Sequence, residues 1–407
     1  MQTPTLPGIP NIHSHAFQRA MAGLAERQTA RRDSFWTWRE RMYGFAGRLD
    51  PGLMRDVAAQ LYVEMLEAGY TAVCEFHYLH HRPDGRSYDD PAAMSKSLLE
   101  AARETGIRLT LLPVLYMSGG FDGRALGERQ RQFAHDVDGF RRLVEDLAGH
   151  EDESLRIGMA LHSLRAVPAD AMRALFEDWS FAQGRPVHVH VAEQVLEVEE
   201  CLAARGARPV EWLLDHAEVD ARWTLVHATH VSDAEVAALA ASGAVVALCP
   251  TTEANLGDGL FPLRDYLQRG GRIGIGSDSN VSVSPVEELR WLEYGQRLAA
   301  RRRNIAVSGD ETSTGALLYS QALAGGLRAC GQPPAAADDF VVLDADAAAL
   351  ACATADDLHD RVVFGGNRPL VDAVHVAGRQ VVVGGRHRDA AAIGRRYRDA
   401  MRTLLSD

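Results

Sequence analysis

Histidines and one aspartate stand at the ends of several predicted β-strands. His13 and His15 are separated by one residue, and because side chains alternate along an extended segment, both point the same way and can reach one ion. His190 ends a later predicted strand, and Asp278 ends the last one. Three imidazoles and one carboxylate leave a position open for water, as in catalytic rather than structural zinc sites. We therefore predict a metal site made of His13, His15, His190 and Asp278.

Neighbouring strand ends carry candidates for proton transfer. Glu193 lies three residues after His190, where its carboxyl can face the metal; a solvated glutamate at the start of the next helix is the alternative interpretation. Hydrolytic removal of ammonia from a C=N carbon requires protons to be delivered to nitrogen, and a glutamate that is not a ligand does this in zinc nucleobase deaminases. His227 ends its strand and is the candidate for contacting the attacking water. His230 is predicted to lie in the following loop, and His188 in the core.

The positions of these residues depend on a repeated pattern of strands and helices. Short β-branched runs alternate with Ala-, Leu-, Glu- and Arg-rich stretches such as Met54–Ala68 and Asp233–Ala241, which is typical of βα units around a parallel sheet. In a barrel of such units, the carboxyl ends of the strands meet at one mouth and form the active site. The pattern predicts the α/β class and a (β/α)8 TIM-type barrel. The eight predicted strands are Pro7–Asn11, Thr71–Phe76, Arg108–Leu115, Leu155–Leu161, Pro186–Val191, Thr224–His227, Ala244–Leu248 and Arg272–Gly276.

The C-terminal part of the chain is richer in short strands. After the barrel, assigned to residues 7–330, and a linker at Pro333–Ala337, we predict a small β-rich domain over residues 338–386. Residues 387–407 are assigned to a terminal helix that covers about Ala390–Leu405. The strands predicted for the small domain are Phe340–Leu343, Val362–Phe364, Val371–Val376 and Gln380–Val383.

Composition excludes several classes of protein. The 407 residues contain 43 Lys and Arg against 55 Asp and Glu, a net charge of −12, without a basic stripe, so nucleic acids and anionic membranes are poor partners. The five cysteines form no CxxC pair, and the N-terminal segment has no apolar run of the kind found in signal peptides. We expect a cytoplasmic enzyme that acts on a small molecule.

Missing residue types narrow the chemistry further. Lys96 is the sole lysine and lies in a helix-like segment, which excludes a binuclear site bridged by a carboxylated lysine on the fourth strand. The chain has no GxxxxGK[ST], GxSxG or helix-opening GxGxxG sequence, so P-loop, serine-hydrolase and Rossmann chemistry lack their motifs. Hydrolysis with a single metal ion is the prediction that is left.

Three strings of residues resemble a known family. They are PNIHSHAFQRAMAG at Pro10–Gly23, EFHYLHH at Glu75–His81 and HSLRAV at His162–Val167. These strings are similar to those of the formimidoylglutamate deiminases, in the mononuclear deaminase branch of the amidohydrolase superfamily, and the resemblance covers nearly the whole chain. It implies one Zn2+ per chain and the hydrolysis of N-formimino-L-glutamate to N-formyl-L-glutamate and ammonia.

The resemblance also implies roles for individual residues. It repeats the metal ligands predicted above and assigns proton transfer and orientation of water to Glu193, His227 and Asp278. A substrate with two carboxylates requires fixed cations in an acidic protein, and Arg can pair with a carboxylate through two hydrogen bonds. The substrate contacts that the resemblance implies are Gln18, Arg39, Tyr78, His162 and Arg165.

Two alternatives stay open at this point. A nucleobase or nucleoside deaminase would share the metal site but need stacking aromatic and amide groups at the mouth of the barrel, and a non-catalytic barrel would be expected to have lost metal ligands. Family members carry several dozen residues before the His-x-His strand, whereas 12 precede His13, so we expect the small domain to lack its N-terminal strands. We also expect a homodimer.

Overall fold

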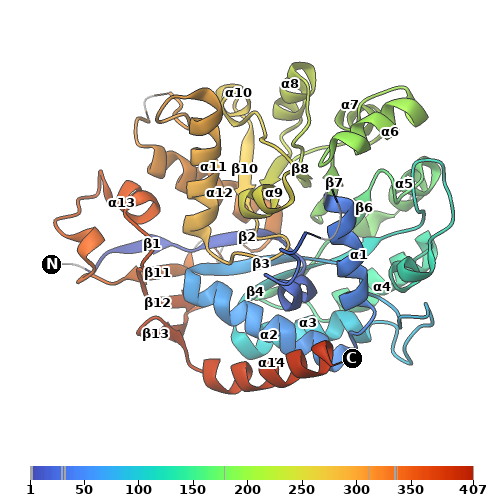
Figure 1. Ribbon diagram of the computed structural model, residues 1–407, viewed down its shortest axis with the longest axis horizontal. Helices are drawn as coiled ribbons and strands as arrows, with labels where there is room; N and C mark the ends of the chain where they lie inside the picture. Colours follow the sequence, from blue (N-terminus) through green and yellow to red (C-terminus); the bar gives the residue numbers. More distant parts are fainter. Residues whose placement is uncertain are drawn as a thin grey trace.

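The computed structural model describes residues 3–28, 31, 34–177, 179–309, 311–333, 336 and 338–406. The strands of its larger sheet are β2 (Ile9–Ser14), β3 (Tyr70–His77), β4 (Arg108–Leu115), β5 (Leu155–Ile157), β6 (Met159–Ser163), β7 (Val187–Val191), β8 (Trp223–His227), β9 (Val245–Leu248) and β10 (Arg272–Ile275). They pair in the order β2-β3-β4-β6-β7-β8-β9-β10, with β5 beside β4, and curve into a barrel with helices outside it (Figure 1). The predicted barrel class is therefore confirmed.

The barrel closes where the candidate metal ligands lie. A parallel bridge between Ser14 and Asp278 joins the first barrel strand to the segment after the last one. The backbone N–H of His15 donates to the Asp278 carbonyl at 3.0 Å, and the Asp278 N–H donates to the His13 carbonyl at 2.9 Å. Closure of the barrel thus brings side chains from the two ends of the barrel sequence into contact.

The fourth predicted strand is interrupted in the structure. We predict Leu155–Leu161 as one strand, but Gly158 separates β5 from β6. A Cβ atom at Gly158 would lie 2.6 Å from Leu112 Cδ2 and 2.8 Å from the Pro186 carbonyl oxygen. The backbone therefore approaches its neighbours too closely there for a larger residue, and the strand breaks at this contact. The first predicted strand, Pro7–Asn11, also runs across a break at Gly8, because β2 begins at Ile9. The remaining predicted barrel strands differ from the structure only at their ends.

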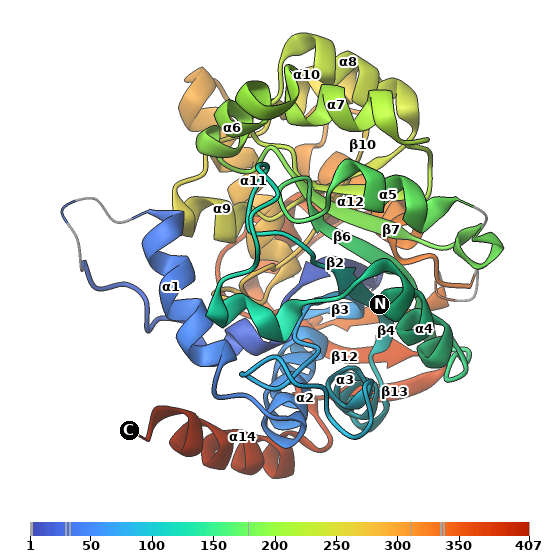
Figure 2. The ribbon, with the colours of Figure 1, turned by 90° about the vertical axis from the view of Figure 1, so that its right-hand side faces the viewer.

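Helices surround the strands (Figure 2). They are α1 (Phe35–Ala46), α2 (Pro51–Ala68), α3 (Ala93–Thr105), α4 (Val137–Ala148), α5 (Ala169–Phe176), α6 (Val195–Arg205), α7 (Pro209–His216), α8 (Asp233–Ser242), α9 (Pro250–Leu256), α10 (Leu263–Gln268), α11 (Pro285–Ala300) and α12 (Thr314–Cys330). The predicted helical stretches Met54–Ala68 and Asp233–Ala241 lie within α2 and α8. Helix α2 begins where the Asp50 side chain accepts a hydrogen bond from the Leu53 N–H at 2.8 Å and ends at Gly69, whose φ of +102° favours glycine.

A smaller antiparallel sheet lies beside the barrel. Its strands, in order of pairing, are β1 (Thr5–Pro7), β11 (Phe340–Leu343), β12 (Val371–Val376), β13 (Arg379–Val383) and β14 (Arg386–His387). Although this sheet is expected from the sequence to lack N-terminal strands, Thr5–Pro7 supplies one. Only Gly8 separates β1 from β2, and such a short strand leaves no readable alternation of side chains. Helix α14 (Ala390–Leu405), predicted with these bounds, packs against α2 (Figure 1).

One predicted strand is wrong, because Val362–Phe364 forms the last turn of helix α13 (Leu358–Phe364). Three apolar residues are too few to distinguish a strand from a buried helical turn. Polar contacts at the start of the helix decide the matter, since Asp357 pairs with Arg361 one turn later at 2.6 Å and accepts from the Thr354 N–H at 2.7 Å. The predicted linker Pro333–Ala337 lies mostly outside the described residues.

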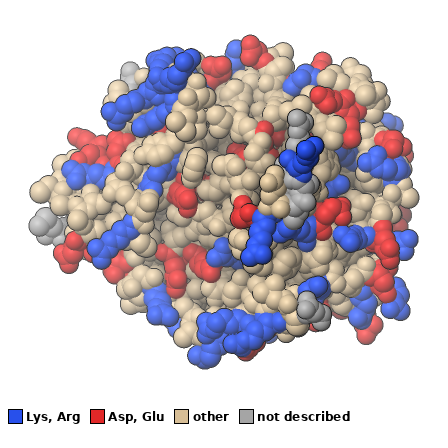
Figure 3. Space-filling view, in the orientation of Figure 1, with Lys and Arg blue, Asp and Glu red and all other residues tan. Residues whose placement is uncertain are grey.

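Charged side chains of both signs lie on one face of the molecule. Basic and acidic side chains are interspersed on the face drawn in Figure 3. Within the described ranges, no helix has the length and apolar character needed to cross a membrane.

Candidate functional site

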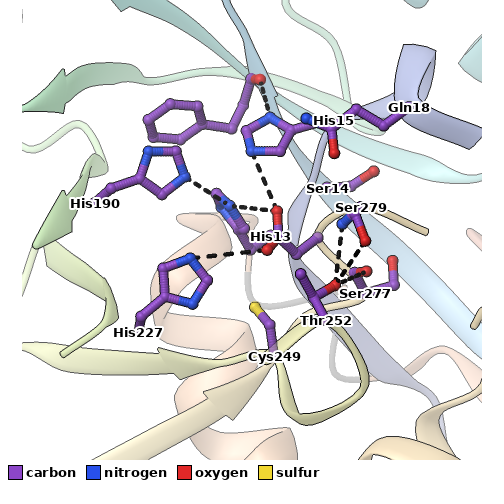
Figure 4. A network of polar contacts seen from close by, with 12 residues as sticks. His13, Ser14, His15, Gln18, His190, His227, Cys249, Thr252, Ser277 and Ser279 are labelled. Carbon is purple, nitrogen blue, oxygen red and sulfur yellow. Dashed lines mark hydrogen bonds and ion pairs between the residues drawn. The ribbon is translucent and has the colours of Figure 1, made fainter. Parts of the chain in front are cut away.

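Side chains from separate strand ends converge at the mouth of the barrel (Figure 4). They are His13 and His15 of β2, His190 of β7, His227 of β8 and Asp278 after β10. The Nε2 atoms of His13 and His190 lie 3.0 Å apart, and Asp278 Oδ1 lies 3.4 Å from His13 Nε2 and 3.3 Å from His15 Nε2. All five side chains are buried. The structure therefore brings the four predicted metal ligands together, with His227 beside them.

The tautomers of His15 and His190 leave their Nε2 lone pairs free to bind a cation. Nδ1 of His15 donates to the Phe76 carbonyl, and Nδ1 of His190 donates to the His162 carbonyl, each at 2.9 Å. Because a carbonyl oxygen only accepts, Nδ1 carries the proton in both rings and Nε2 presents a lone pair. Ligand nitrogens of His15, His190 and His13 all lie within 4.8 Å of one another. With the aspartate carboxylate, this donor set fits zinc.

The segment that carries Asp278 is held in a strained conformation by a buried polar network. Asp278 has φ +47° and Asn280 has φ +57°, a region that non-glycine residues adopt at a cost. Asn280 Nδ2 donates to the carbonyls of His15 at 3.1 Å and Asp278 at 3.0 Å. Ser277 Oγ donates to Asn280 Oδ1, and Asn11 Nδ2 donates to Ser277 Oγ, both at 2.6 Å. The network fixes the carboxylate relative to the histidines.

His227 has carboxylates near both ring nitrogens. Its Nδ1 donates to Glu253 Oε1 at 3.2 Å, while its Nε2 lies 3.7 Å from Asp278 Oδ2 and 3.9 Å from Glu193 Oε1. Burial by itself lowers the pKa of His227, but the three carboxylates outweigh it and raise the pKa to about 10. Burial also raises the pKa of the Glu193 carboxyl. The site thus contains two adjacent groups whose proton affinity is increased by their surroundings.

Glu253 is a residue that the sequence did not single out. It lies in the first turn of α9 and is 6% exposed. Its Oε1 also accepts from the Cys249 N–H at 2.9 Å. By accepting the Nδ1 proton of His227, Glu253 turns the other ring nitrogen toward Asp278, as a buried aspartate does for histidine in serine-protease triads. No motif marks Glu253, because it follows His227 by 26 residues on another element.

A cavity adjoins the histidines and Glu193. The substrate contacts implied by the resemblance all line it, namely Gln18, Arg39, Tyr78, His162 and Arg165. Gln18 Nε2 donates to the Tyr78 hydroxyl at 3.0 Å, whereas the buried Gln18 Oε1 has no partner among the described residues. The cavity therefore offers an orphaned polar atom as well as cationic side chains to a ligand.

Two arginines in the cavity flank one aromatic ring. The guanidinium carbons of Arg39 and Arg165 lie 4.4 and 5.7 Å from the centre of the Trp36 ring, where cations are attracted to the π-face. Glu40, the residue next to Arg39 in the sequence, pairs with Arg129 at 3.1 Å. In the described part of the chain, the buried Nε of each cavity arginine has no hydrogen-bond partner. Because a buried polar group without a hydrogen bond is costly, these side chains suit an anionic ligand.

The rest of the cavity wall is largely aromatic, and the sequence did not predict it. The Tyr116 and His162 rings lie 4.4 Å apart, and Tyr116 accepts at its hydroxyl from Gln130 Nε2 at 2.8 Å. The aromatic run FWTW at Phe35–Trp38 is the single sequence signal that points to this wall. The lining residues missed in this way are Phe35, Trp38, Met42, Tyr43, Tyr116, Phe133 and Leu256.

The other two strand-end histidines lie outside the cavity lining. His188 is fully buried and donates to the Ala329 carbonyl at 3.0 Å, which confirms the predicted core position. His230 lies in the loop after β8, as predicted, and its carbonyl accepts from Arg208 Nη2 at 2.6 Å.

Comparison with families and curated proteins places the site in context. Residues 5–319 match the model of the Amidohydrolase family. The formimidoylglutamate deiminase of Pseudomonas aeruginosa is 51% identical over 414 aligned residues, which cover 98% of this chain and 89% of that protein. The 8-oxoguanine deaminase of the same organism is 26% identical, with 95% and 86% covered.

Solved structures show the same fold. An amidohydrolase from Brucella melitensis superposes with a TM-score of 0.93 at 47% identity, covering 99% of this chain and 90% of that one. A zinc-bound adenosine deaminase from Xanthomonas campestris gives a TM-score of 0.79 at 21% identity, with 98% and 86% covered. At that identity the second likeness concerns the fold alone.

Proposed function

Since the chain belongs to the amidohydrolase family, we propose that it is a zinc-dependent formimidoylglutamate deiminase, which hydrolyses N-formimino-L-glutamate to N-formyl-L-glutamate and ammonia. The observation that carries this proposal is the pair Arg39 and Arg165 in a cavity beside the four candidate metal ligands. Two guanidinium groups suit the two carboxylates of a glutamate derivative. The 51% identity to a protein named formimidoylglutamate deiminase supports the same substrate.

The proposed reaction adds water to the formimino carbon. A bound Zn2+, held by the ligands named above, supplies water of lowered pKa. Asp278 and the Nε2 atom of His227 would orient the attacking water, and the Asp278 carboxylate would take its proton. Glu193, whose Oε1 lies 3.9 Å from His227 Nε2, delivers protons to the formimino nitrogen. One water is consumed, the C–N bond to that nitrogen breaks, and ammonia leaves a formyl group behind.

The remaining cavity residues position the substrate in this proposal. Arg39 and Arg165 bind the carboxylates, and Trp36 keeps their guanidinium groups at a fixed spacing. Gln18 and Tyr78, already hydrogen-bonded to each other, offer the orphaned Gln18 Oε1 to an N–H group of the substrate. His162 also lines the cavity, and its carbonyl accepts a hydrogen bond from His190 Nδ1.

The proposal is tested by ammonia release from N-formimino-L-glutamate by the zinc-loaded protein. We expect rapid release that is lost when the metal is removed with a chelator and restored by zinc. The aspartate analogue, run alongside, tests whether the spacing of the carboxylates matters. No release from a folded, zinc-loaded protein would reject the proposed substrate.

The aromatic wall favours a second candidate, a nucleobase or nucleoside deaminase. Tyr43, Tyr116 and Phe133 line the cavity, and aromatic faces can stack on a heterocyclic ring. Cytosine, guanine and adenosine therefore belong in the same assay. Turnover of one of them, with none of N-formimino-L-glutamate, would select this candidate over the first.

Replacing Arg165 by methionine is expected to raise the KM for N-formimino-L-glutamate about 10- to 100-fold with a small change in kcat. The reason is the loss of a hydrogen bond between charged groups, about 1.5–3 kcal/mol, in ground and transition states alike. Arg173→Met, an exposed position on α5, is the matched control and is expected to leave KM unchanged. An unaltered KM in the Arg165 variant would contradict the assigned carboxylate contact.

Replacing Glu253 by leucine is expected to lower kcat about 10- to 100-fold, because the His227 Nδ1–H loses a charged acceptor worth about 1.5–3 kcal/mol. Glutamine keeps an oxygen at the position of Oε1 and is expected to recover much of the rate. Steady-state kinetics, metal content and thermal melting of both variants separate this effect from misfolding. Equal losses in both variants would argue against a positioning role.

Assembly and location complete the proposal. We propose a homodimer in the cytoplasm, with a small dianionic substrate as the sole partner needed for activity. Sedimentation of the purified protein tests the homodimer, and fractionation of the producing cells tests the cytoplasmic location.

A further inference from the structure

A second group of metal-ligating side chains lies behind His227. It consists of the His227 imidazole, the Cys249 thiol and the Glu253 carboxylate, and one donor atom of each lies within 4.8 Å of the other two. All three residues are buried. They come from the end of β8, the residue after β9 and the first turn of α9. Figure 4 shows the Cys249 thiol on the side of His227. His227 thus stands between this group and the four ligands described above.

The donor atoms select a class of ion. A thiolate, an imidazole and a carboxylate suit Zn2+ or Cd2+, whereas Mg2+ and Ca2+ prefer oxygen ligands. Glu253 Oε1 accepts from His227 Nδ1 at 3.2 Å and from the Cys249 N–H at 2.9 Å, so its carboxylate is already held between the other two residues. A cation that binds here replaces the Nδ1 proton and the thiol proton, and two protons are released.

The charge around this group also favours a cation. Asp278 and Glu193 lie 3.7 and 3.9 Å from His227 Nε2, and Glu253 lies 3.2 Å from its Nδ1. Even with a divalent ion on the first set of ligands, Glu193, Glu253 and a Cys249 thiolate leave negative charge that a second divalent ion can balance.

We propose that His227, Cys249 and Glu253 bind a second divalent cation of the zinc or cadmium type, and that this binding inhibits the enzyme. The cation takes the Nδ1 atom that Glu253 holds in the active arrangement, and it thereby removes the hydrogen bond that orients the His227 ring. The inhibition rests on the proposed function, in which Nε2 acts on the attacking water. The binding of the cation does not depend on the identity of the substrate.

Cadmium titration of the zinc-loaded protein tests the binding. Cd2+ is added to protein that carries one zinc per chain, and the ultraviolet charge-transfer band of a cadmium thiolate is followed together with metal content after desalting. We expect one further equivalent of cadmium, a thiolate band and at least a tenfold loss of ammonia release. Cadmium that merely replaces zinc among the histidines and Asp278 contacts no thiol and gives no band, and that outcome would overturn the proposal.

Cysteine variants assign the band. Cys352→Ser removes the exposed thiol and is expected to retain both band and inhibition, whereas Cys249→Ala is expected to lose both relative to its own untreated activity. Glu253→Gln leaves the thiol in place and is expected to weaken cadmium binding at least tenfold. This second variant tests the site even if the Cys249 variant does not fold. A band of wild-type size in Cys249→Ala, or unaltered affinity in Glu253→Gln, would refute the site. If N-formimino-L-glutamate is not hydrolysed at all, the proposed function fails while band and stoichiometry still decide the cation site.

Discussion

Replacing Glu193 by glutamine is expected to lower kcat by about 10²- to 10⁴-fold while the metal stays bound. The Glu193 carboxyl is 5% exposed and lies 3.9 Å from His227 Nε2. Its backbone N–H donates to Glu197 Oε2 at 3.2 Å, which holds the residue in place after β7. Burial raises the pKa of Glu193, so the carboxyl can carry the proton that the leaving nitrogen needs. The glutamine amide has the same shape but cannot release or take up a proton near neutral pH.

Steady-state kinetics on N-formimino-L-glutamate, with zinc measured in the same samples, checks this expectation. Glu199→Gln is the matched control, because Glu199 is exposed on the neighbouring helix α6, and its kcat is expected to equal that of the unaltered protein. A Glu193 variant with full kcat and normal zinc content would remove this residue from the reaction.

The metal ligands could be predicted from sequence because the constraint on them is local. The spacing of His13 and His15 puts both on one side of a strand, and parallel strands carry their ends to one mouth. The same logic separated His190 from His188, which lies deeper in the barrel and donates to the Ala329 carbonyl. Local periodicity and barrel topology together were therefore sufficient to place these side chains.

Residues brought in from other elements could not be predicted in this way. Glu253 reaches His227 from the first turn of α9, and Tyr116 reaches His162 from beyond β4. Trp36 matters to the site because the guanidinium groups of Arg39 and Arg165 lie over its ring. Each of these contacts depends on the tertiary path of a loop or helix, which leaves no periodic signal in the sequence.

Short segments limited the prediction of the fold for a related reason. Thr5–Pro7 is a strand because Val342 and its neighbours in β11 pair with it, and Val362–Phe364 is helical because Asp357 and Arg361 form a pair one turn apart. In both cases, contacts made by residues outside the three-residue segment determine its conformation. Propensity over three residues is too weak to decide between strand and helix.

The barrel and the small sheet are tied together by a buried ion pair. Arg108 of β4 bonds to Asp339, which precedes β11, through Nε–Oδ2 at 2.6 Å and Nη2–Oδ1 at 3.1 Å. The two side chains are 3% and 2% exposed. Arg108 Nη1 also donates to the Glu153 carbonyl at 2.6 Å, and Asp339 Oδ1 accepts from the Ala377 N–H at 2.9 Å. The pair is therefore bidentate and further hydrogen-bonded, the geometry in which a buried ion pair is best compensated.

Replacing Asp339 by alanine is expected to lower the free energy of unfolding by about 3–5 kcal/mol, because the Arg108 guanidinium is left buried without a counter-charge. Calorimetry should show a melting temperature lower by roughly 4–6 °C. Asp399→Asn breaks an ion pair whose partners are 75% and 70% exposed, and this control is expected to change stability by at most about 1 kcal/mol. The double variant Arg108→Met, Asp339→Leu removes both charges and is expected to be more stable than Asp339→Ala alone. If the single and double variants melt together, the cost arises from lost packing and not from the unpaired charge.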